Sequence, residues 1–258
     1  MKIAIIGVGN MGGAIARGLC KGSIVKPEDI VLSNPSPRKL EDIKATYAAI
    51  HTTHSNVEAA SSAQLIILAV KPWKIKEVID EIAPTSSQII VSVAAGIDFE
   101  ELDAMLPQRG NAIFRVIPNT AIGLQESMTL ISSYRASAEQ EKYILDMFNE
   151  MGMALLIPER QMSAATSMTS CGIAYALKYI QAAMQAGVEL GIYPQEGMKM
   201  VAQSMKGAAE LILQNDTHPS VEIDKVCTPG GYTIKGINTL DAHGFTTAII
   251  EAIKSSCD

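Results

Sequence analysis

Short apolar stretches alternate with longer mixed stretches along the first part of the chain. The short stretches are rich in Ile, Val, Leu and Ala, as expected of strands that are covered on both faces. They predict strands at residues 3–6, 30–33, 49–51, 65–69, 89–93, 112–116, 128–132 and 153–157. Helix-forming segments follow Gly12, Arg38, Lys74, Phe99 and Ala138. This alternation predicts an α/β domain with a largely parallel sheet and helices on both faces.

The pattern changes from Pro158 onward, where the strand signal ends and Ala, Met, Leu and Gln dominate. Segments 160–190 and 194–214 are long enough to be helices, so we expect an all-helical second domain. Its many methionines provide adaptable apolar surface, which suits a core or a subunit interface. Because apolar helices without their own sheet pack naturally against a second copy, we expect a homo-oligomer, a homodimer or an assembly of dimers. The predicted domains are residues 1–157 and 158–258.

Composition narrows the class of protein. The 258 residues are 48% hydrophobic, enough for a packed core, and no apolar run is long enough to cross a membrane. The chain opens directly with a predicted core strand, so we expect a cytoplasmic protein with no membrane partner. Its four cysteines and four histidines lack the spacing of disulfide frameworks or metal sites. The net charge of −6 and the absence of a Lys/Arg cluster argue against a nucleic-acid partner.

A glycine-rich motif joins the first predicted strand to the first predicted helix. Gly7 permits a tight turn, Gly9 lets a pyrophosphate approach the backbone, and Gly12 lets the helix pack closely on its strand. The helix then presents free N–H groups to the phosphates. The alternative is a turn that is merely rich in glycine, but the strand, turn and helix context favours a Rossmann-like dinucleotide-binding domain. The motif comprises Gly7, Val8, Gly9, Asn10, Met11 and Gly12.

The segment after the second predicted strand favours NADP(H). In NAD-binding domains of this kind, an acidic residue about 20 residues past the glycines binds the ribose 2′-OH. None is available here. Hydroxyl, amide and guanidinium groups that could donate to a 2′-phosphate stand there instead: Ser33, Asn34, Ser36 and Arg38. The alternative is that these are ordinary turn residues and a solvated arginine. We predict NADPH as the cofactor, with NADH also possible.

Three later strand ends carry further residues that we assign to the cofactor. Ligands of open α/β sheets bind at the carboxyl ends of the strands, and small residues there let a flat nicotinamide lie close to the backbone. Lys71 precedes a proline at a strand exit, a position that suits support of a loop or phosphate better than catalysis. The residues assigned to the cofactor at these ends are Val70, Lys71, Pro72, Ala95 and Asn119.

A second anion site is predicted near the C-terminus. Thr228, a Pro-Gly-Gly turn and a helix that begins near Tyr232 point backbone N–H groups and a positive helix dipole in one direction. The ligand there should carry a carboxylate. Thr233, on the first helical turn, can both donate and accept a hydrogen bond beside that anion. The alternative is that Thr228 and Thr233 simply cap the helix.

These motifs, in this order, resemble the pyrroline-5-carboxylate reductase family over essentially the whole chain. The matching blocks are residues 7–12, 69–72, 94–96, 115–120 and 226–234, with Gly236, Leu240 and Asp241. The resemblance implies the NAD(P)H-dependent reduction of 1-pyrroline-5-carboxylate to L-proline, the last step of proline biosynthesis. It also implies that Asn56 contacts the adenosine end of NADPH and that Thr233 meets the substrate ring nitrogen. Thr228 and the backbone of Gly230, Gly231, Tyr232 and Thr233 would hold the substrate carboxylate.

Two features depart from the family pattern. Residues 169–175 read Thr-Ser-Cys-Gly-Ile-Ala-Tyr where the family usually has Ser-Gly-Ser-Gly-Pro-Ala-Tyr, and Tyr232 occupies a position that is usually smaller. The changes either reflect compensated packing, which we favour, or reshape the substrate pocket. Ser170, Cys171 and Ile173 also give some support to a non-catalytic NADP(H)-binding regulator.

Two other enzymes of similar architecture remain as alternatives. A β-hydroxyacid dehydrogenase would need a helical Lys four residues after a Gly, and an Asn four residues later. Here Gly172 is followed at those offsets by Ala176 and Ile180, and Lys178 is out of register. An imine reductase that acts on uncharged cyclic imines would not need the anion site at residues 228–233.

Overall fold

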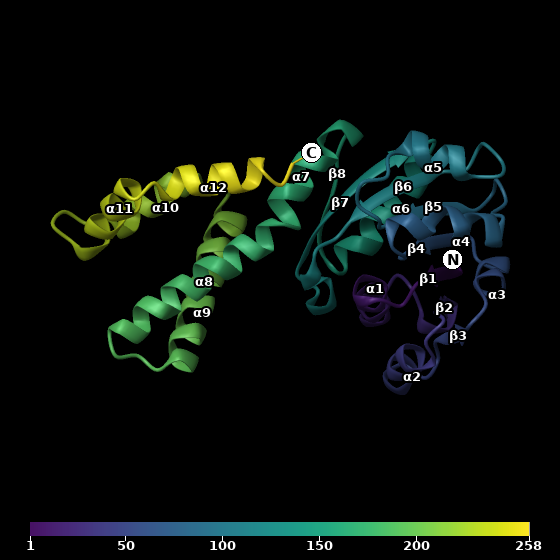
Figure 1. The fold of residues 1–258 in the computed structure, drawn as a ribbon, viewed down its shortest axis with the longest axis horizontal. Coiled ribbons are helices and arrows are strands. Elements are labelled where there is room, and N and C mark those ends of the chain that lie inside the picture. The colour runs from purple at the N-terminus through teal and green to yellow at the C-terminus, as the bar shows by residue number, and fades with distance from the viewer. Residues whose placement is uncertain (258) are drawn as a thin grey trace. The chain divides into compact units, whose positions relative to one another are not determined.

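The computed structural model describes residues 1–257. It divides into two compact units, Met1–Ser170 and a second that begins at Cys171. The first unit contains an eight-stranded sheet in the order β3-β2-β1-β4-β5-β6-β7-β8 (Figure 1). The strands are β1 (Ile3–Ile6), β2 (Ile30–Ser33), β3 (His51–Thr53), β4 (Leu65–Leu68), β5 (Ile89–Ser92), β6 (Ile113–Ile117), β7 (Ser127–Tyr134) and β8 (Gly152–Leu156).

The prediction of a largely parallel sheet is confirmed, since among the described strand pairs only β6 and β7 run antiparallel. The third strand differs most from its predicted position, while the bounds of the others agree to within two residues. Residues 49–51 were expected to form the third strand, but β3 begins at His51. Ile50 is buried in the turn before this strand, where its N–H donates to the Tyr47 carbonyl. An apolar residue that is buried in a turn has the same sequence pattern as the first residue of a buried strand, so the strand was predicted to begin too early.

Helices cover both faces of the sheet, as expected. Residues Ile3 and Ile5 of β1 belong to one apolar cluster, and the intervening Ala4 and Ile6 belong to another, because successive side chains of a strand point to opposite faces. The first cluster contains residues of α1 (Asn10–Lys21), α2 (Pro37–Thr46) and α6 (Ala138–Asn149). The second contains residues of α3 (Asn56–Ser61), α4 (Ile75–Ile82) and α5 (Phe99–Met105). Short 3-10 helices lie at Pro27–Asp29 (η1), Pro72–Lys74 (η2), Thr120–Leu124 (η3) and Glu159–Gln161 (η4).

The first unit also includes α7 (Met162–Thr169). Met162 is buried against Ile117 and Leu130 of the sheet, which holds the start of α7 on β6 and β7. Segment 160–190 is therefore two helices, and the second, α8 (Gly172–Glu189), starts the next unit after a break at Ser170 and Cys171. The predicted boundary between a cofactor-binding domain and a helical domain at residues 157 and 158 stays a prediction. The two compact units divide later in the chain, after Ser170.

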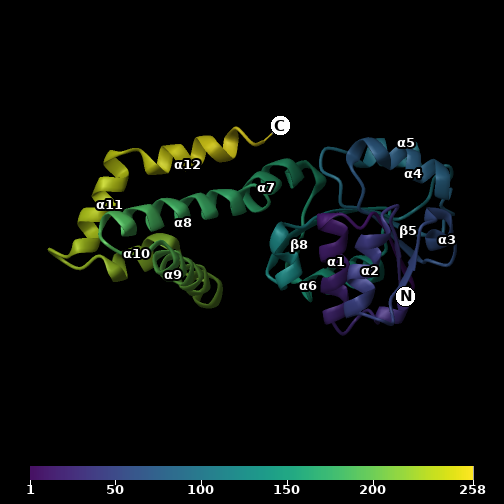
Figure 2. The ribbon, with the colours of Figure 1, turned by 60° about the horizontal axis from the view of Figure 1, so that its bottom comes forward.

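The second unit is helical over its described length (Figures 1 and 2). Its helices after α8 are α9 (Pro194–Asn215), α10 (Pro219–Val226), α11 (Tyr232–Ala242) and α12 (Phe245–Lys254). Helices α8 and α9 pack side by side, and the Tyr175 hydroxyl near the start of α8 donates to the Ala252 carbonyl of α12 at 3.1 Å. Within residues 1–257, no helix is both long and apolar enough to cross a membrane.

Candidate functional site

The turn between β1 and α1 depends on two glycines that leave no room for a side chain. Gly7 has a φ of +96°, and a Cβ there would lie 2.6 Å from the Ala69 carbonyl oxygen. A Cβ on Gly12 would lie 2.0 Å from the Gly7 carbonyl oxygen. These contacts bring α1 against the ends of β1 and β4, so the close packing inferred from the motif is present in the structure.

The same turn leaves open space beside backbone N–H groups. A Cβ on Gly9 would meet no atom within 4 Å. Gly9 is the N-cap of α1 and makes no side-chain cap, while the Gly13 N–H bonds the Gly9 carbonyl at 2.9 Å. The amides before Gly13 in the first helical turn therefore lack helical partners. Free amides, the positive end of the helix dipole and open space together fit the pyrophosphate of a dinucleotide.

The later strand ends lie at the same edge of the sheet as this turn. The register pairs Ile6 with Leu68, Leu68 with Ser92, and Ser92 with Arg115, so β1, β4, β5 and β6 end side by side. Lys71 and Ala95 are exposed there, and Val70 and Pro72 are half-buried. Asn119 is only 5% exposed, and its Oδ1 accepts the Ala121 N–H at 3.0 Å, so that oxygen caps η3.

Two of the predicted phosphate donors are already bonded to the protein. Ser33 is fully buried, and its hydroxyl donates to Asn56 Oδ1 at 2.7 Å. Asn34 is 7% exposed, its Oδ1 accepts the Val8 N–H at 3.0 Å, and its Nδ2 donates to the Ser36 carbonyl at 3.2 Å. The geometry therefore gives Ser33 and Asn34 a supporting role around the glycine turn, unlike the direct donation expected from the sequence. Arg38, by contrast, is exposed, and Ser36 is half-buried.

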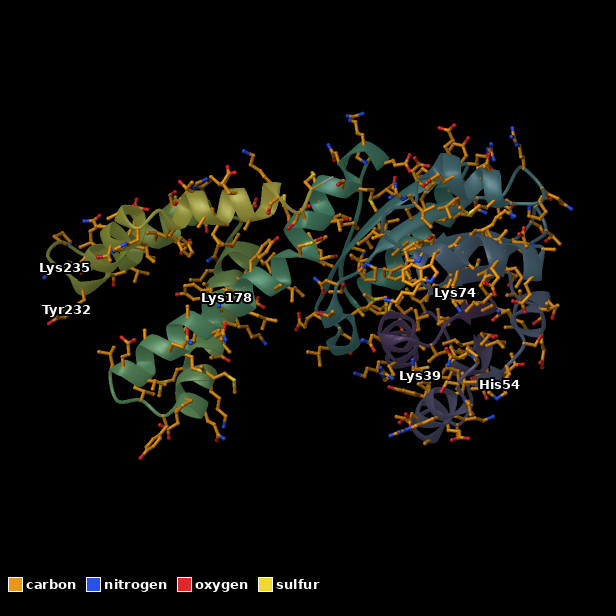
Figure 3. All side chains as sticks on the ribbon, in the orientation of Figure 1. Lys39, His54, Lys74, Lys178, Tyr232 and Lys235 are labelled. Carbon is orange, nitrogen blue, oxygen red and sulfur yellow. The ribbon has the colours of Figure 1, made fainter. Side chains whose placement is uncertain are left out.

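His54 joins this group, although no motif or resemblance selected it. Its Nδ1 lies 2.9 Å from the Asn34 carbonyl oxygen, and the residue is exposed immediately after β3 (Figure 3). The neighbouring Asn56, which the resemblance assigns to the adenosine end, also donates from Nδ2 to Glu81 at 2.7 Å. The signal that could have selected His54 is its position at the carboxyl end of a parallel strand next to the second.

The described residues contain no group of three or more His, Cys, Asp or Glu side chains that could hold a metal ion. The Cys20 thiol lies on the buried side of α1, and burial raises its pKa to about 11. Cys20 is therefore a neutral thiol at physiological pH and a weak nucleophile.

The turn before α11 places a hydroxyl at the start of that helix. Gly230 has a φ of +73°, and the Gly231 N–H donates to the Thr228 carbonyl at 3.0 Å. A Cβ on Gly231 would lie 2.6 Å from Thr228 Oγ1, so the glycine makes room for the threonine side chain. Gly231 is the N-cap of α11, and no side chain caps this helix. The alternative that Thr228 and Thr233 serve as helix caps therefore finds no support.

Both hydroxyls at this turn are available to a ligand. Within residues 1–257, neither Thr228 Oγ1 nor Thr233 Oγ1 has a hydrogen-bond partner, and both residues are exposed. Tyr232, between them, is 93% exposed, with Lys235 Nζ 5.9 Å from the centre of its ring (Figure 3). The start of α11 therefore combines free amides with two free hydroxyls, which fits a small carboxylate that also carries a hydrogen-bonding group.

Lys178, the lysine that a β-hydroxyacid dehydrogenase would have to use, is exposed on α8. Its Nζ donates to Gln181 Oε1 at 3.0 Å on the next helical turn. The residues at the offsets expected for that class of enzyme are Ala176 and Ile180, which have no polar side-chain atom. The described helix thus lacks the constellation that the alternative requires.

Comparisons with known proteins give one consistent result. Residues 159–258 match the family model for pyrroline-5-carboxylate reductase dimerisation, and residues 2–96 match that for NADP oxidoreductase, coenzyme F420-dependent. The chain is 36% identical over 270 residues to pyrroline-5-carboxylate reductase 1 of Dictyostelium discoideum, covering 99% of this chain and 48% of that protein. It is also 36% identical to pyrroline-5-carboxylate reductase 2 of the same organism, covering 100% of this chain and 91% of that protein. The chain thus spans about half the length of the first relative and most of the second.

The fold is also similar to a solved structure. A crystal structure of the Plasmodium falciparum pyrroline carboxylate reductase with NADP bound has a TM-score of 0.89 and 29% identity. The match covers 100% of this chain and 95% of that one, so it includes both compact units.

Proposed function

Because this chain belongs to the pyrroline-5-carboxylate reductase family, we propose that it reduces 1-pyrroline-5-carboxylate to L-proline with NADPH, the last step of proline biosynthesis. The observation that carries this proposal is the pair of anion-binding turns at α1 and α11. The first has the open space beside Gly9 that a pyrophosphate requires. The second has unpartnered hydroxyls beside free amides, as a carboxylate on a nitrogen-containing ring requires.

The chemistry asks the protein chiefly for position. When bound, NADPH supplies a hydride to the imine carbon, and a proton on the ring nitrogen completes the amine. A protonated cyclic imine is already a strong hydride acceptor, so the protein needs no strong acid. Thr233 accepts a hydrogen bond from the ring N–H and fixes the orientation of the ring. Thr228 and the amides of Gly230, Tyr232 and Thr233 hold the carboxylate, while the Gly231 amide, which donates to the Thr228 carbonyl, shapes the turn.

The cofactor is held mainly by the first unit in this proposal. The backbone of the glycine motif binds the pyrophosphate, Asn56 contacts the adenosine, and Ser36 and Arg38 donate to the 2′-phosphate. Ser33 and Asn34 hold these groups in place through the hydrogen bonds described above. The nicotinamide lies near the later strand ends, against Val70, Lys71, Pro72, Ala95 and Asn119. A purified protein with a clearly higher kcat/KM for NADH than for NADPH would contradict the 2′-phosphate assignment.

The second unit supplies a subunit interface in this proposal, making the protein a homodimer or an assembly of dimers. No apolar side chain is buried between Cys171 and Cys257, so a second copy of the chain could bury the apolar faces of these helices. Light scattering that finds an active monomer at assay concentration would remove this part of the proposal. We also place the protein in the cytoplasm, since Cys20, Cys171 and Cys227 form no disulfide, as is usual in reducing compartments.

The direct test is a spectrophotometric assay of purified protein with 1-pyrroline-5-carboxylate and NADPH. We expect NADPH oxidation with formation of one proline for each NADPH consumed. Faster turnover of uncharged cyclic imines than of 1-pyrroline-5-carboxylate would instead favour an imine reductase. Tight NADPH binding without turnover of either substrate would favour a non-catalytic regulator.

A further inference from the structure

We propose that His54 determines cofactor specificity by binding the 2′-phosphate of NADPH through its Nε2–H. The inference rests on the proposed NADPH-dependent function and adds a residue that neither the motifs nor the resemblance selected. It follows from the position of His54, the orientation of its ring and the groups already occupied around it.

The position of His54 follows from the register of three parallel strands. Ile6 at the end of β1 pairs with Ser33 at the end of β2, and Ser33 pairs with Thr53 at the end of β3. His54 comes directly after Thr53, so it lies at the edge of the sheet that carries the glycine turn. The ribose 2′ position of a bound dinucleotide lies near the end of the second strand in folds of this kind. His54 thus directly follows β3, the strand next to the one whose end lies near the 2′ position.

The hydrogen bond to Asn34 fixes which ring nitrogen is available. Nδ1 lies 2.9 Å from the Asn34 carbonyl oxygen, and a carbonyl oxygen only accepts hydrogen bonds. Nδ1 must therefore carry the proton, and Nε2 is the nitrogen left for a ligand. His54 is exposed, and within residues 1–257 its Nε2 has no partner. In the imidazolium form Nε2 also carries a proton, so it can donate a charge-assisted hydrogen bond to a phosphate oxygen.

Asn34 also holds the glycine turn, so the position of the His54 ring is set relative to the cofactor site. Asn34 Oδ1 accepts the Val8 N–H at 3.0 Å, while the Asn34 carbonyl accepts from His54 at 2.9 Å. Because Asn34 is only 7% exposed, this link is shielded from water. One buried residue therefore connects the turn that binds the pyrophosphate with the imidazole that would bind the 2′-phosphate.

The neighbouring polar groups are mostly occupied. The Ser33 hydroxyl donates to Asn56, and the carboxylate of Glu58 accepts from the Thr53 hydroxyl. Glu81 accepts from Asn56 at 2.7 Å. In residues 34–39 and 54–59, which directly follow β2 and β3, the exposed cationic or potentially cationic groups are Arg38, Lys39 and His54, and Figure 3 labels Lys39 and His54. His54 differs from the other two because its ring is anchored, so less side-chain entropy is lost when it binds.

The experiment compares two nucleotides that differ only by the 2′-phosphate, adenosine 2′,5′-bisphosphate and adenosine 5′-monophosphate. Their affinities are measured by calorimetry on the full-length protein and on His54→Gln. We expect His54→Gln to bind the bisphosphate roughly tenfold more weakly, as loss of one charge-assisted hydrogen bond predicts, with little change for the monophosphate. His54→Arg, which restores a cation, should recover most of the lost affinity.

His51→Gln is the matched control, because His51 is also an exposed histidine of β3 but lies at the opposite end of that strand. It should leave both affinities unchanged. An equal loss for both nucleotides in His54→Gln would overturn the proposal, because His54 would then act only by supporting Asn34. Unchanged affinities would overturn it as well. Neither nucleotide contains a nicotinamide, so both measurements report binding alone. Their outcomes do not depend on whether the protein reduces 1-pyrroline-5-carboxylate.

Discussion

The two compact units treat their apolar side chains in opposite ways. In the first, Ile, Val, Leu and Phe side chains are buried on both faces of the sheet, and Phe114 and Phe148 are fully enclosed. In the second, no apolar side chain between Cys171 and Cys257 is buried, and Leu190 is 83% exposed. The first unit therefore has a core of its own. The second leaves its apolar side chains at least partly exposed, and burying them against a second copy would stabilise the proposed dimer.

The second unit has a groove lined by exposed apolar side chains. Its volume is about 450 Å³, and it lies on α8 and α9. Most of its lining is apolar: Ala174, Leu177, Lys178, Ile180, Gln181, Met184 and Met198. Methionines fit irregular partners well, so a second copy of the same helices can fill it.

The largest effect is expected from a charge in this groove. Leu177 is 59% exposed in the single chain, and Leu177→Glu would place a carboxylate in the proposed interface. Desolvating an unpaired carboxylate costs several kcal/mol, so the dimer should weaken by at least about a hundredfold and activity should be lost. Sedimentation and the reductase assay measure both effects, while calorimetry should show that NADPH binding by the first unit persists.

Leu124→Glu serves as the control for that experiment. Leu124 is 77% exposed in η3 of the first unit, so the added charge stays in water. We expect the oligomeric state to be unchanged. If Leu177→Glu remains a dimer with full activity, the groove is not the interface.

The glycine turn tests the first unit in a pair of variants. A Cβ on Gly12 would lie 2.0 Å from the Gly7 carbonyl oxygen, so Gly12→Ala must move the backbone. We expect this overpacking to cost about 1 to 3 kcal/mol of unfolding free energy and to abolish tight NADPH binding. A Cβ on Gly9 meets nothing within 4 Å, so Gly9→Ala should keep the stability but weaken NADPH binding by filling the space for the pyrophosphate. Denaturant unfolding and calorimetry separate the two; equal stability losses would contradict this geometry.

Thr233 tests the chemistry assigned to the second unit. Thr233→Val keeps the shape and removes the hydroxyl that has no partner within residues 1–257. A hydrogen bond worth roughly 1 to 3 kcal/mol when left unmade predicts a fall in kcat/KM of about one to two orders of magnitude, with NADPH affinity unchanged.

Thr228→Val gives the contrasting result in the same assay. It should act mainly through the substrate KM, because a carboxylate anchor holds ground and transition states alike. Wild-type kcat/KM in a folded Thr233→Val protein would require another partner for the ring nitrogen.

The smallest effect is a pH dependence inside the first unit. Burial raises the pKa of Glu150, but hydrogen bonds from the Ser23 hydroxyl and the amides of Ser23 and Ile24 outweigh it and lower that pKa below 4.5. A lowered pKa means that the carboxylate stabilises the fold above its ordinary pKa, and that this stability is lost as pH falls through the folded value. Glu150→Gln should therefore lower Tm by a few degrees at neutral pH, with the difference disappearing in acid.

Glu41→Gln, on the exposed side of α2, is the control and should leave Tm unchanged across the same pH range. A Tm difference for Glu150→Gln that persists unchanged in acid would show that packing, and not the carboxylate charge, makes the contribution.

The sequence predicted most elements of the fold for identifiable reasons. Continuous apolar runs such as Ile3–Ile6 and Leu65–Leu68 are covered on both faces, so their composition alone reveals them. The third strand was misplaced because Ile50 is buried in a turn, and burial looks the same in sequence whether the backbone is extended or turned. The break between α7 and α8 was missed because the intervening Ser170 and Cys171 carry no Pro or strong turn signal.

The sequence by itself determined the chemistry that depends on backbone freedom and order along the chain. It placed the glycines of the first turn, the Pro-Gly-Gly turn before α11 and the absence of an acid after β2, because each is a local property of a short segment. Only the tertiary structure decided which polar side chains remain available. Asn34 looks like a phosphate donor in sequence, yet Val8, Ser36 and His54 occupy it, and His54 is brought beside it only by the pairing of β2 with β3. Hydrogen-bond partners far apart in the chain have no signature in a single sequence, because the sheet register sets them.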